Sequence, residues 1–316
     1  MTKIRTFAGF LIVGILVYSG LWYTSSFQAR KDTEAMFSSW RDKGLKVEHG
    51  KVKLSGFPYR IVITVDGLQV RTRGPGLNVG AENIMLVSHL WTPGHWVADA
   101  TNVSVRAADD AVSATDGSMR GSYRIHEDGK AVIVLDSGDM SDFSLLKAPG
   151  VTGPKLLKNW QLFLRSDPTH HEPESGLYED RFLDFKLVVD TGATELEASG
   201  GIMGPVIRDW TQTSLGAWRD AGGLLELDAV KLVTGGGRLG GNASLTLDDK
   251  FRPLGSATLK LVGPKVIAAE IKAIGLPDVA KALARAGDEE LSAMLQMGVL
   301  TLEGQQVTAL KPLLDD

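Results

Sequence analysis

Residues 222–262 read GGLLELDAVKLVTGGGRLGGNASLTLDDKFRPLGSATLKLV, and their pattern decides the fold of the chain. From Arg238 to Asp248, apolar or small side chains alternate with polar ones without a break, which is typical of a strand with one face in water. A second such run begins at Ser256, after the turn-forming residues 249–253, and a third lies upstream at residues 225–230. The stretch therefore predicts a three-stranded antiparallel meander whose apolar face other elements must cover.

The alternating pattern extends over the residues before the meander. The runs that predict further strands are 45–54, 59–66, 68–71, 77–87, 97–105, 121–126, 131–135, 156–165 and 182–189. Gly56, Phe57 and Pro58 separate the first two runs, because proline lacks the N–H that a continuous ladder needs. Regular short strands of this kind predict a long antiparallel sheet.

Helices are expected mainly in the last third, where prolines and acidic residues mark their first turns. Three begin at Pro205, Pro264 and Pro277, and a fourth, after residues 288–290, carries Leu291, Met294 and Leu295. Each has one narrow apolar stripe, which suits a helix that covers a sheet. The predicted fold class is mainly β (α+β): a long curved antiparallel sheet with a few covering helices in the C-terminal third, plus an N-terminal transmembrane helix.

Residues 7–23, FAGFLIVGILVYSGLWY, carry no charge and have about the length needed to cross a bilayer. The apolar anchor residues are Phe10, Leu11, Ile12, Val13, Ile15, Leu16, Val17, Leu21 and Trp22. A cleaved signal peptide is the alternative, but the residues after Leu21 offer no small-x-small cleavage site. Lys3 and Arg5 precede the run and favour a cytoplasmic N-terminus. In a bacterium, this places the anchor in the inner membrane and the bulk of the chain in the periplasm.

The predicted organisation has four parts: a membrane anchor (1–24), a helical linker (25–44), a β-rich half (45–200), and the meander with its covering helices (201–316). The linker has Met36, Phe37 and Trp40 on one side. The β-rich half predicts many strands and almost no covering helices. Its apolar face is therefore the place where an open trough is expected.

Composition excludes several functional classes. The chain has 316 residues, 43% of them hydrophobic, which is sufficient for a substantial core. A net charge of -4 lacks the basic excess of a nucleic-acid-binding protein. There is no cysteine, which removes disulfides, thiol catalysis and thiolate metal sites.

Motifs that would specify a reaction or a cofactor are weak. Gly235, Gly237 and Gly240 match G-x-G-x-x-G, but a strand follows them where a nucleotide-binding fingerprint needs a helix. Residues 170–174, HHEPE, are read as a solvated loop in preference to a metal site, and Asp136, Asp139 and Asp142 lack the glycine and terminal glutamate of a calcium-binding loop. There is no G-x-S-x-G, H-E-x-x-H or P-loop motif. We expect no enzyme activity, no cofactor and no metal.

Trp91 and Trp96 lie in the sequence HLWTPGHW at residues 89–96. Two tryptophans in one turn could form a partner or membrane-surface contact, because such side chains are costly to leave exposed. The alternative, which we favour at this point, is that they fill the core beneath a strand connection.

Several stretches resemble an uncharacterised alphaproteobacterial family, domain of unknown function 2125. The points of similarity are the N-terminal anchor, SGFPYR at 55–60, HLWTP at 89–93, WRDAGGLLEL at 218–227, Leu247-Asp248, and PLG at 253–255. The family has no established activity, so the resemblance implies no catalytic residues. More remotely, it implies a relation to AsmA-like envelope proteins, whose curved sheets are associated with lipid homeostasis between membranes.

The function expected from the sequence is that of a membrane-anchored periplasmic protein of envelope maintenance, which binds or transfers lipid on a concave apolar sheet. The candidate lining residues are Tyr59, Ile61, Ile63, Val65, Leu245 and Leu247. The alternative is a scaffold protein with a fully packed sheet that binds other envelope proteins, and an enzyme is the least favoured class.

Overall fold

The computed structural model describes residues 2–72, 77–107, 112–138, 140–145, 156–167, 180–207, 211–273 and 276–313. The chain forms two compact units, Met1–Arg124 and Ile125–Asp316. Strands make up 54% of the structure, and the strand pairs described within each unit are antiparallel. The predicted mainly β fold class is therefore confirmed. The boundary predicted between the β-rich half (45–200) and the part that contains the meander (201–316) falls within strand β12 (Thr194–Met203).

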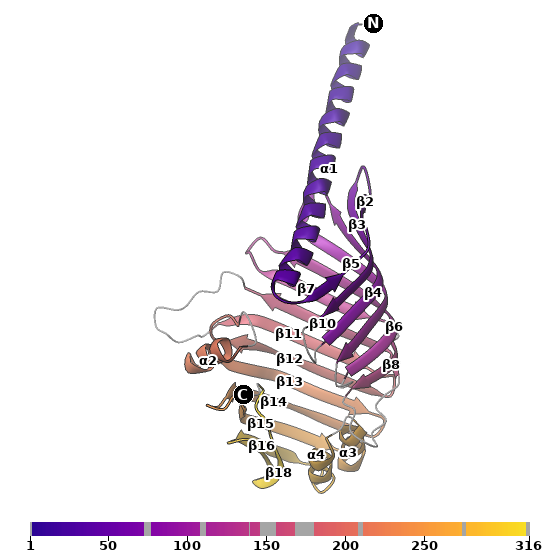
Figure 1. The fold of residues 1–316 in the computed structure, drawn as a ribbon. Helices are drawn as coiled ribbons and strands as arrows, with labels where there is room; N and C mark the ends of the chain where they lie inside the picture. Colours follow the sequence, from indigo (N-terminus) through magenta and orange to yellow (C-terminus); the bar gives the residue numbers. More distant parts are fainter. Residues whose placement is uncertain are drawn as a thin grey trace. The chain divides into compact units, whose positions relative to one another are not determined.

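The described part of the first unit contains one long helix and six strands. They are α1 (Thr2–Asp42), β1 (Lys46–Glu48), β2 (Val52–Ser55), β3 (Arg60–Arg71), β4 (Leu77–His89), β5 (Thr92–Ala107) and β6 (Val112–Ile125). Strands β1 and β2 both pair with β3, and the order then follows the sequence from β3 to β6. Helix α1 runs along this sheet, and its N-terminal part continues past the sheet (Figure 1).

The core of the first unit lies between the C-terminal part of α1 and the strands β1 to β3. Phe37 of α1 is 2% exposed and packs with Val47, Val52 and the buried face of β3. The expected linker helix is the last part of α1, which continues without interruption to Asp42 and ends before Gly44, where φ is 92°. The apolar side of residues 25–44 is therefore part of the core of the first unit and covers its sheet.

The described part of the second unit contains most of the strands. Its described strands are β7 (Ala131–Ser137), β8 (Met140–Leu145), β9 (Leu156–Leu157), β10 (Asn159–Ser166), β11 (Arg181–Asp190), β12, β13 (Leu224–Thr234), β14 (Gly237–Leu247), β15 (Pro253–Val262), β16 (Glu290–Gln296), β17 (Val299–Leu302) and β18 (Gln305–Ala309). Its described helices are α2 (Gln212–Asp220), between β12 and β13, and α3 (Pro264–Ala273) and α4 (Pro277–Leu283), between β15 and β16. Strand β7 pairs with β10, from which the order follows the sequence to β18.

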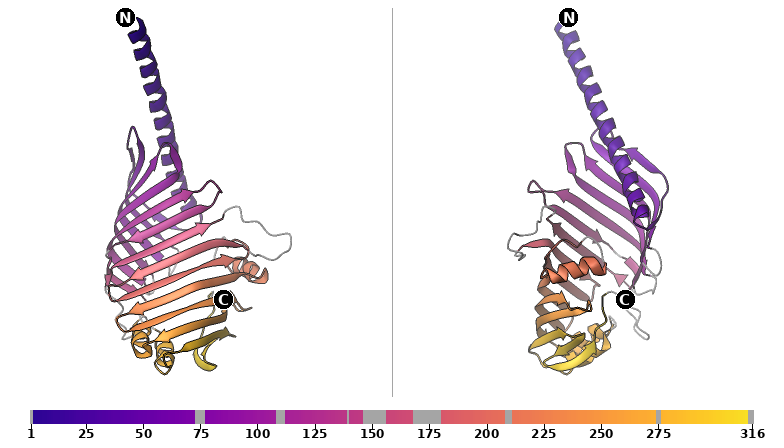
Figure 2. Two further views of the ribbon diagram at one scale, coloured as in Figure 1. Left: turned by 180° about the vertical axis from the view of Figure 1, so that it is seen from behind. Right: turned by 60° about the vertical axis from the view of Figure 1, so that its left-hand side comes forward.

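The predicted meander is confirmed as β13, β14 and β15, with Ala243 of the central strand opposite Leu227 and Ala257. Its apolar face is covered at both ends. Leu239 packs beneath α3 and α4 in one buried cluster, and Leu247 packs with Trp218 of α2 in another. The two covers lie at opposite ends of the strands (Figure 2).

Two of the predicted helices need correction. Residues 290–296 form strand β16, because Leu291 and Ala293 alternate into the core opposite Leu259 and Ala257. The helix expected from Pro205 begins only at Gln212, where the side chain of Thr211 accepts a hydrogen bond from the Ser214 N–H and caps the first turn. The helices at Pro264 and Pro277 and the closing hairpin are confirmed.

Candidate functional site

Strand β3 presents its apolar side chains to α1. Ile61, Ile63 and Val65 alternate along the strand and are 6%, 1% and 1% exposed. The structure therefore places these predicted lining residues in or beside the core of the first unit. Tyr59 lies before β3, in the turn that follows β2, and is 65% exposed. In the second unit, Leu247 is buried beneath Trp218, and Leu245 is half-buried on the same strand.

A cleft of about 720 Å³ separates part of α1 from the sheet of the first unit. The helix wall is formed by Thr24, Ser25, Gln28, Ala29, Asp32, Thr33 and Met36. The sheet wall is formed by Ile61, Leu86, Ser88, His89, Leu90 and Trp96. The helix residues recur at intervals of three and four and so share one face of α1. The volume is within the range of about 300–1,000 Å³ that is typical of ligand pockets.

The two walls of the cleft differ in polarity. The sheet wall is largely apolar, because Leu86, Leu90 and Trp96 pack against the core cluster that contains Ile61. The helix wall is mainly polar. This combination fits an amphiphilic ligand better than a purely apolar or a purely charged one.

Most polar groups of the cleft already have partners within the protein. Gln28 Nε2 donates to Asp32 Oδ1 at 2.7 Å, and Ser88 Oγ donates to the His95 carbonyl oxygen at 2.7 Å. In the described part of the chain, His89 Nδ1 is buried and has no hydrogen-bond partner.

The two tryptophans considered as candidate partner contacts or core residues have different environments. Trp96 lines the cleft and packs against the core of the first unit. Trp91 is 61% exposed, and its ring stacks on His89 with centroids 5.2 Å apart. Since His89 also lines the cleft, Trp91 supports the sheet wall from outside.

The N-terminal part of α1 has the features of a membrane span. Within the described residues, this is the one helix long and apolar enough to cross a membrane, and the same test is passed by signal sequences near an N-terminus. The predicted anchor residues from Phe10 to Leu21 are 55–75% exposed. The cleft begins at Thr24, directly after this apolar segment.

Two side chains of α1 bind the connection between β2 and β3. Tyr18 donates its hydroxyl to the Pro58 carbonyl oxygen at 2.6 Å, and Trp22 Nε1 donates to the Arg60 carbonyl oxygen at 2.8 Å. Trp22 also makes an edge-to-face contact with Phe57, with centroids 5.3 Å apart. These contacts join the apolar part of the helix to the sheet. The sequence showed the spacing of Tyr18 and Trp22, but nothing in it indicated their partners.

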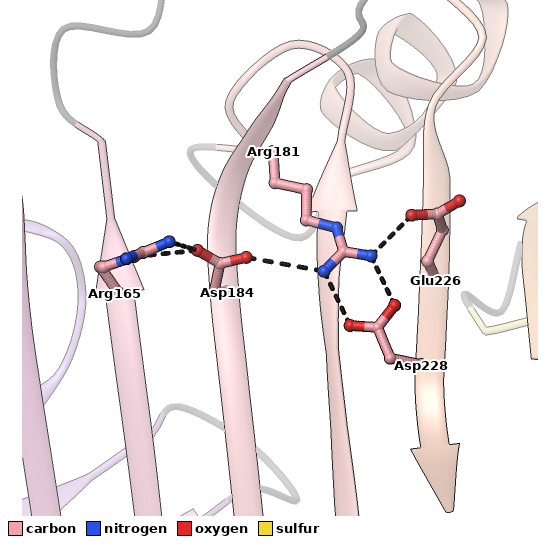
Figure 3. A network of polar contacts seen from close by, with 5 residues as sticks. All are labelled: Arg165, Arg181, Asp184, Glu226 and Asp228. Carbon is pink, nitrogen blue, oxygen red and sulfur yellow. Dashed lines mark hydrogen bonds and ion pairs between the residues drawn. The ribbon is translucent and has the colours of Figure 1, made fainter. Parts of the chain in front are cut away.

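The second unit contains an ion-pair network around Arg181 (Figure 3). The guanidinium lies 2.7 Å from Glu226, 2.6 Å from Asp228 and 3.7 Å from Asp184, which also contacts Arg165 at 2.8 Å. Hydrogen bonding to Asp228 raises the pKa of Arg181, and the same bonds hold the pKa of Asp228 below its usual range. Because carboxylates surround the cation, the network has the character of a structural tie between β10, β11 and β13.

A glycine gives Arg181 its path across β12. A Cβ atom added at Gly201 would lie 2.2 Å from Arg181 Cδ, so only glycine allows the side chain to lie flat over the strand and reach β13. The register shifts between Ser199 and Gly200 of β12, opposite β13. The network thus depends on backbone features as much as on charge.

The remaining sequence candidates contribute no assembled site within the described residues. The part of the chain that the structure describes holds no group of three or more His, Cys, Asp or Glu side chains placed to bind a metal. Residues 170–174 and Asp139 lie outside the described ranges. Gly237 and Gly240 belong to β14, which follows the turn at Gly235 and Gly236.

Fold and site together define a class: an antiparallel β-sheet protein with an N-terminal apolar helix and an amphiphilic cleft beside that helix. The chain belongs to the family described as "Uncharacterized protein conserved in bacteria (DUF2125)", whose model matches residues 22–302. This confirms the family resemblance seen in the sequence, while the remoter likeness to AsmA-like proteins stays a prediction. No curated protein and no solved structure matches the chain.

Proposed function

We propose that this chain is a membrane-anchored lipid-binding protein of the bacterial envelope, which holds the acyl portion of a lipid in the cleft between α1 and the sheet of its first unit. The observation that carries the proposal is the position of the cleft. It begins at Thr24, immediately after the exposed apolar segment of α1. A lipid in the membrane next to that segment would be close to the cleft entrance. In this proposal the protein binds and transfers its ligand and catalyses no reaction.

The exposed segment of α1 supports membrane anchoring. Side chains such as Phe10, 75% exposed, and Leu16, 65% exposed, would be costly to leave in water but are favourable in a bilayer. Lys3 and Arg5 precede the segment, which favours a cytoplasmic N-terminus in the inner membrane and a periplasmic location for the chain that follows the segment.

The polarity of the cleft supports an amphiphile as its ligand. Leu86, Leu90 and Trp96 offer an apolar wall for an acyl chain. The side chain of Ser25 offers a hydrogen bond to an ester or headgroup oxygen. The ligand class that fits is therefore a glycerophospholipid or a related acylated lipid.

The test is photocrosslinking of the full-length protein in vesicles of phosphatidylethanolamine and phosphatidylglycerol that contain an acyl-chain diazirine phosphatidylethanolamine. The expected result is labelling of peptides from both cleft walls, residues 24–36 and 86–96. Labelling of the 10–23 segment reports anchoring separately. Crosslinks restricted to that segment would refute lipid binding in the cleft and leave the anchor in place.

A matched pair of helix variants makes this test specific. Ala29→Phe fills the cleft, whereas Ala35→Phe adds the same ring at an exposed position of the same helix. Crosslinking to residues 86–96 should fall several-fold for Ala29→Phe and remain unchanged for Ala35→Phe. Equal crosslinking in the two variants would show that the cleft is not the site.

A scaffold function is the second candidate, and the exposure of Trp91 favours it. A tryptophan that is 61% exposed is a common centre of protein–protein contacts. A photoreactive amino acid at position 91 should then crosslink one reproducible envelope protein in cells. Lipid crosslinks from the same position, without a protein partner, would favour lipid binding.

A further inference from the structure

The connection between β2 and β3 exposes two aromatic rings at its tip. The hydrogen bond from the Arg60 N–H to the Gly56 carbonyl oxygen closes the turn, and Gly56 has a φ of 100°, which glycine adopts without strain. Phe57 is 55% exposed and Tyr59 is 65% exposed. Two large exposed rings within three residues are unusual on a water-facing turn and characteristic of a binding surface.

This tip is fixed beside the apolar segment of α1. Tyr18 and Trp22 are one turn apart on the helix, and they donate hydrogen bonds to the backbone on either side of Tyr59, at Pro58 and Arg60. Phe57 adds its contact with the Trp22 ring. The tip therefore has a defined height along α1, between Tyr18 and Trp22.

That height corresponds to the outer interface of a membrane that α1 spans. A hydrocarbon core of about 30 Å takes about 20 helical residues. Counted from the basic residues Lys3 and Arg5, a span of this length ends near Trp22 and Tyr23. Tyrosine and tryptophan are enriched at this depth because their rings are apolar and their N–H or O–H groups need polar partners.

We infer that the tip of the β2–β3 hairpin, Phe57 to Tyr59, docks beside α1 into the lipid–water interface at the outer face of the membrane that α1 spans. The tip thereby forms a second contact with the bilayer. This rests on the proposed membrane anchor, from which it takes its depth. Phe57 and Tyr59 extend the aromatic belt that Trp22 and Tyr23 begin on the helix. Arg60, exposed and next to the tip, suits the anionic headgroups of such an interface.

Docking of the hairpin tip gives the cleft a fixed orientation toward the membrane. If α1 were the only contact with the bilayer, α1 and the sheet packed on it could tilt together in the membrane. A second contact, at the hairpin tip, holds the sheet wall of the cleft at one distance from the lipid surface. Ile61, at the start of β3, lines the cleft and lies two residues from Tyr59. The hairpin thereby connects the membrane surface to the interior of the cleft.

The experiment uses single cysteines, which the cysteine-free chain permits without removing native residues. Tyr59→Cys and Phe57→Cys carry an environment-sensitive nitrobenzoxadiazole label in the full-length protein. The protein is reconstituted in phosphatidylethanolamine–phosphatidylglycerol vesicles with lipids spin-labelled either near the headgroup or at mid-chain. Leu16→Cys reports the span. Arg71→Cys is exposed at the other end of β3, about 36 Å from Arg60 along the strand.

The expected result is several-fold stronger quenching of the Tyr59 and Phe57 labels by headgroup-proximal spin labels than of the Arg71 label. The Leu16 label should be quenched most by mid-chain spin labels. Quenching at Leu16 without quenching at Tyr59 or Phe57 would overturn this inference and leave the anchor intact. An unquenched Leu16 label would overturn both.

Discussion

In the described parts of the chain, the first unit covers its sheet with the end of one long helix, whereas the second uses three short ones. In the second unit, each cover places fully buried side chains on the sheet, such as Ile267 of α3 at 0% exposed and Leu283 of α4 at 2%. In the first unit, α1 buries Phe37 near its C-terminus but leaves Met36 39% exposed above the cleft. A short helix that starts and ends on the sheet can pack along its whole length, while a helix that continues past the sheet packs only where the sheet reaches it.

The physical origin of this difference lies in what fixes each helix. Helices α3 and α4 begin at Pro264 and Pro277 and pack against each other as well as against the sheet, so burial of their apolar stripes decides their positions. The direction of α1 is also set by its hydrogen bonds to the β2–β3 connection through Tyr18 and Trp22. Contact at two distant places leaves room between them, and the cleft occupies that room.

The largest expected effect comes from shortening a cover residue of the second unit. Ile267→Ala should lower the free energy of unfolding by about 2–5 kcal/mol, because it removes buried methyl groups and leaves a cavity beneath α3. The measurement is urea denaturation of the full-length protein in detergent, followed by tryptophan fluorescence.

Its counterpart in the first unit is Met36→Ala, which should change stability by less than about 1 kcal/mol because the side chain borders a cleft. Val266→Ala, at a 39% exposed position of α3, controls for the change in helix composition. Equal losses for Ile267→Ala and Met36→Ala would show that both units are packed to the same density.

A smaller effect on stability is expected when a larger side chain is introduced between a covering helix and its sheet. Ala280 of α4 is 4% exposed and faces the core cluster of the second unit, so Ala280→Leu should destabilise the protein by about 1–3 kcal/mol. Ala29→Leu makes the same change on α1, where the cleft has space for it, and should alter stability by about 0.5 kcal/mol or less.

Differential scanning fluorimetry of both variants in the same detergent compares these two melting temperatures directly. A large loss for Ala29→Leu would mean that the cleft closes in solution. Unchanged melting for Ala280→Leu would instead mean that α4 can move off its sheet.

Local patterns in the sequence were sufficient to predict a strand where one of its faces is buried and the other is in water. Leu239, Ala243 and Leu247 lie on one face of a run that alternates with period two, so the meander was predicted with its correct central strand. The same reasoning failed at residues 290–296, because Leu291, Met294 and Leu295 also fit a helical face after an acidic first turn. Pairing with β15 decides between the two, and that is a tertiary interaction.

The candidate site was only partly predictable for a related reason. Ile61 and Trp96 were identified from the sequence, but the helix wall was assigned to a linker, since the contact between α1 and β3 joins segments that are far apart in sequence. The apolar side of residues 33–43, with Phe37 and Trp40, was the available signal. Amphipathicity shows that a helix covers something, but not which strand it covers or how much space remains.

The smallest expected effect concerns charge, and it compares a carboxylate in each unit. Arg181 donates hydrogen bonds to Asp228 in the second unit, and Lys53 lies 2.7 Å from Asp66 in the first, so both cations hold the pKa of their partner below its usual range. A lowered pKa in the folded state contributes stability that is fully present above the unfolded pKa, about 4 for aspartate. That contribution is lost as the pH falls through the folded pKa.

Arg181→Met should therefore lower the melting temperature at neutral pH, and the difference from the parent protein should shrink as the pH falls below about 4. The mutated network involves Glu226 and Asp184 as well as Asp228, so its loss leaves three carboxylates close together. Lys53→Met breaks one pair whose side chains are 59% and 41% exposed, and should change the profile less, because a solvent-exposed ion pair contributes little to stability. The measurement is melting temperature from pH 3 to pH 7 at low and high salt. Parallel profiles for Arg181→Met and the parent would show that Arg181 contributes through the packing of its stem over Gly201 and not through its charge.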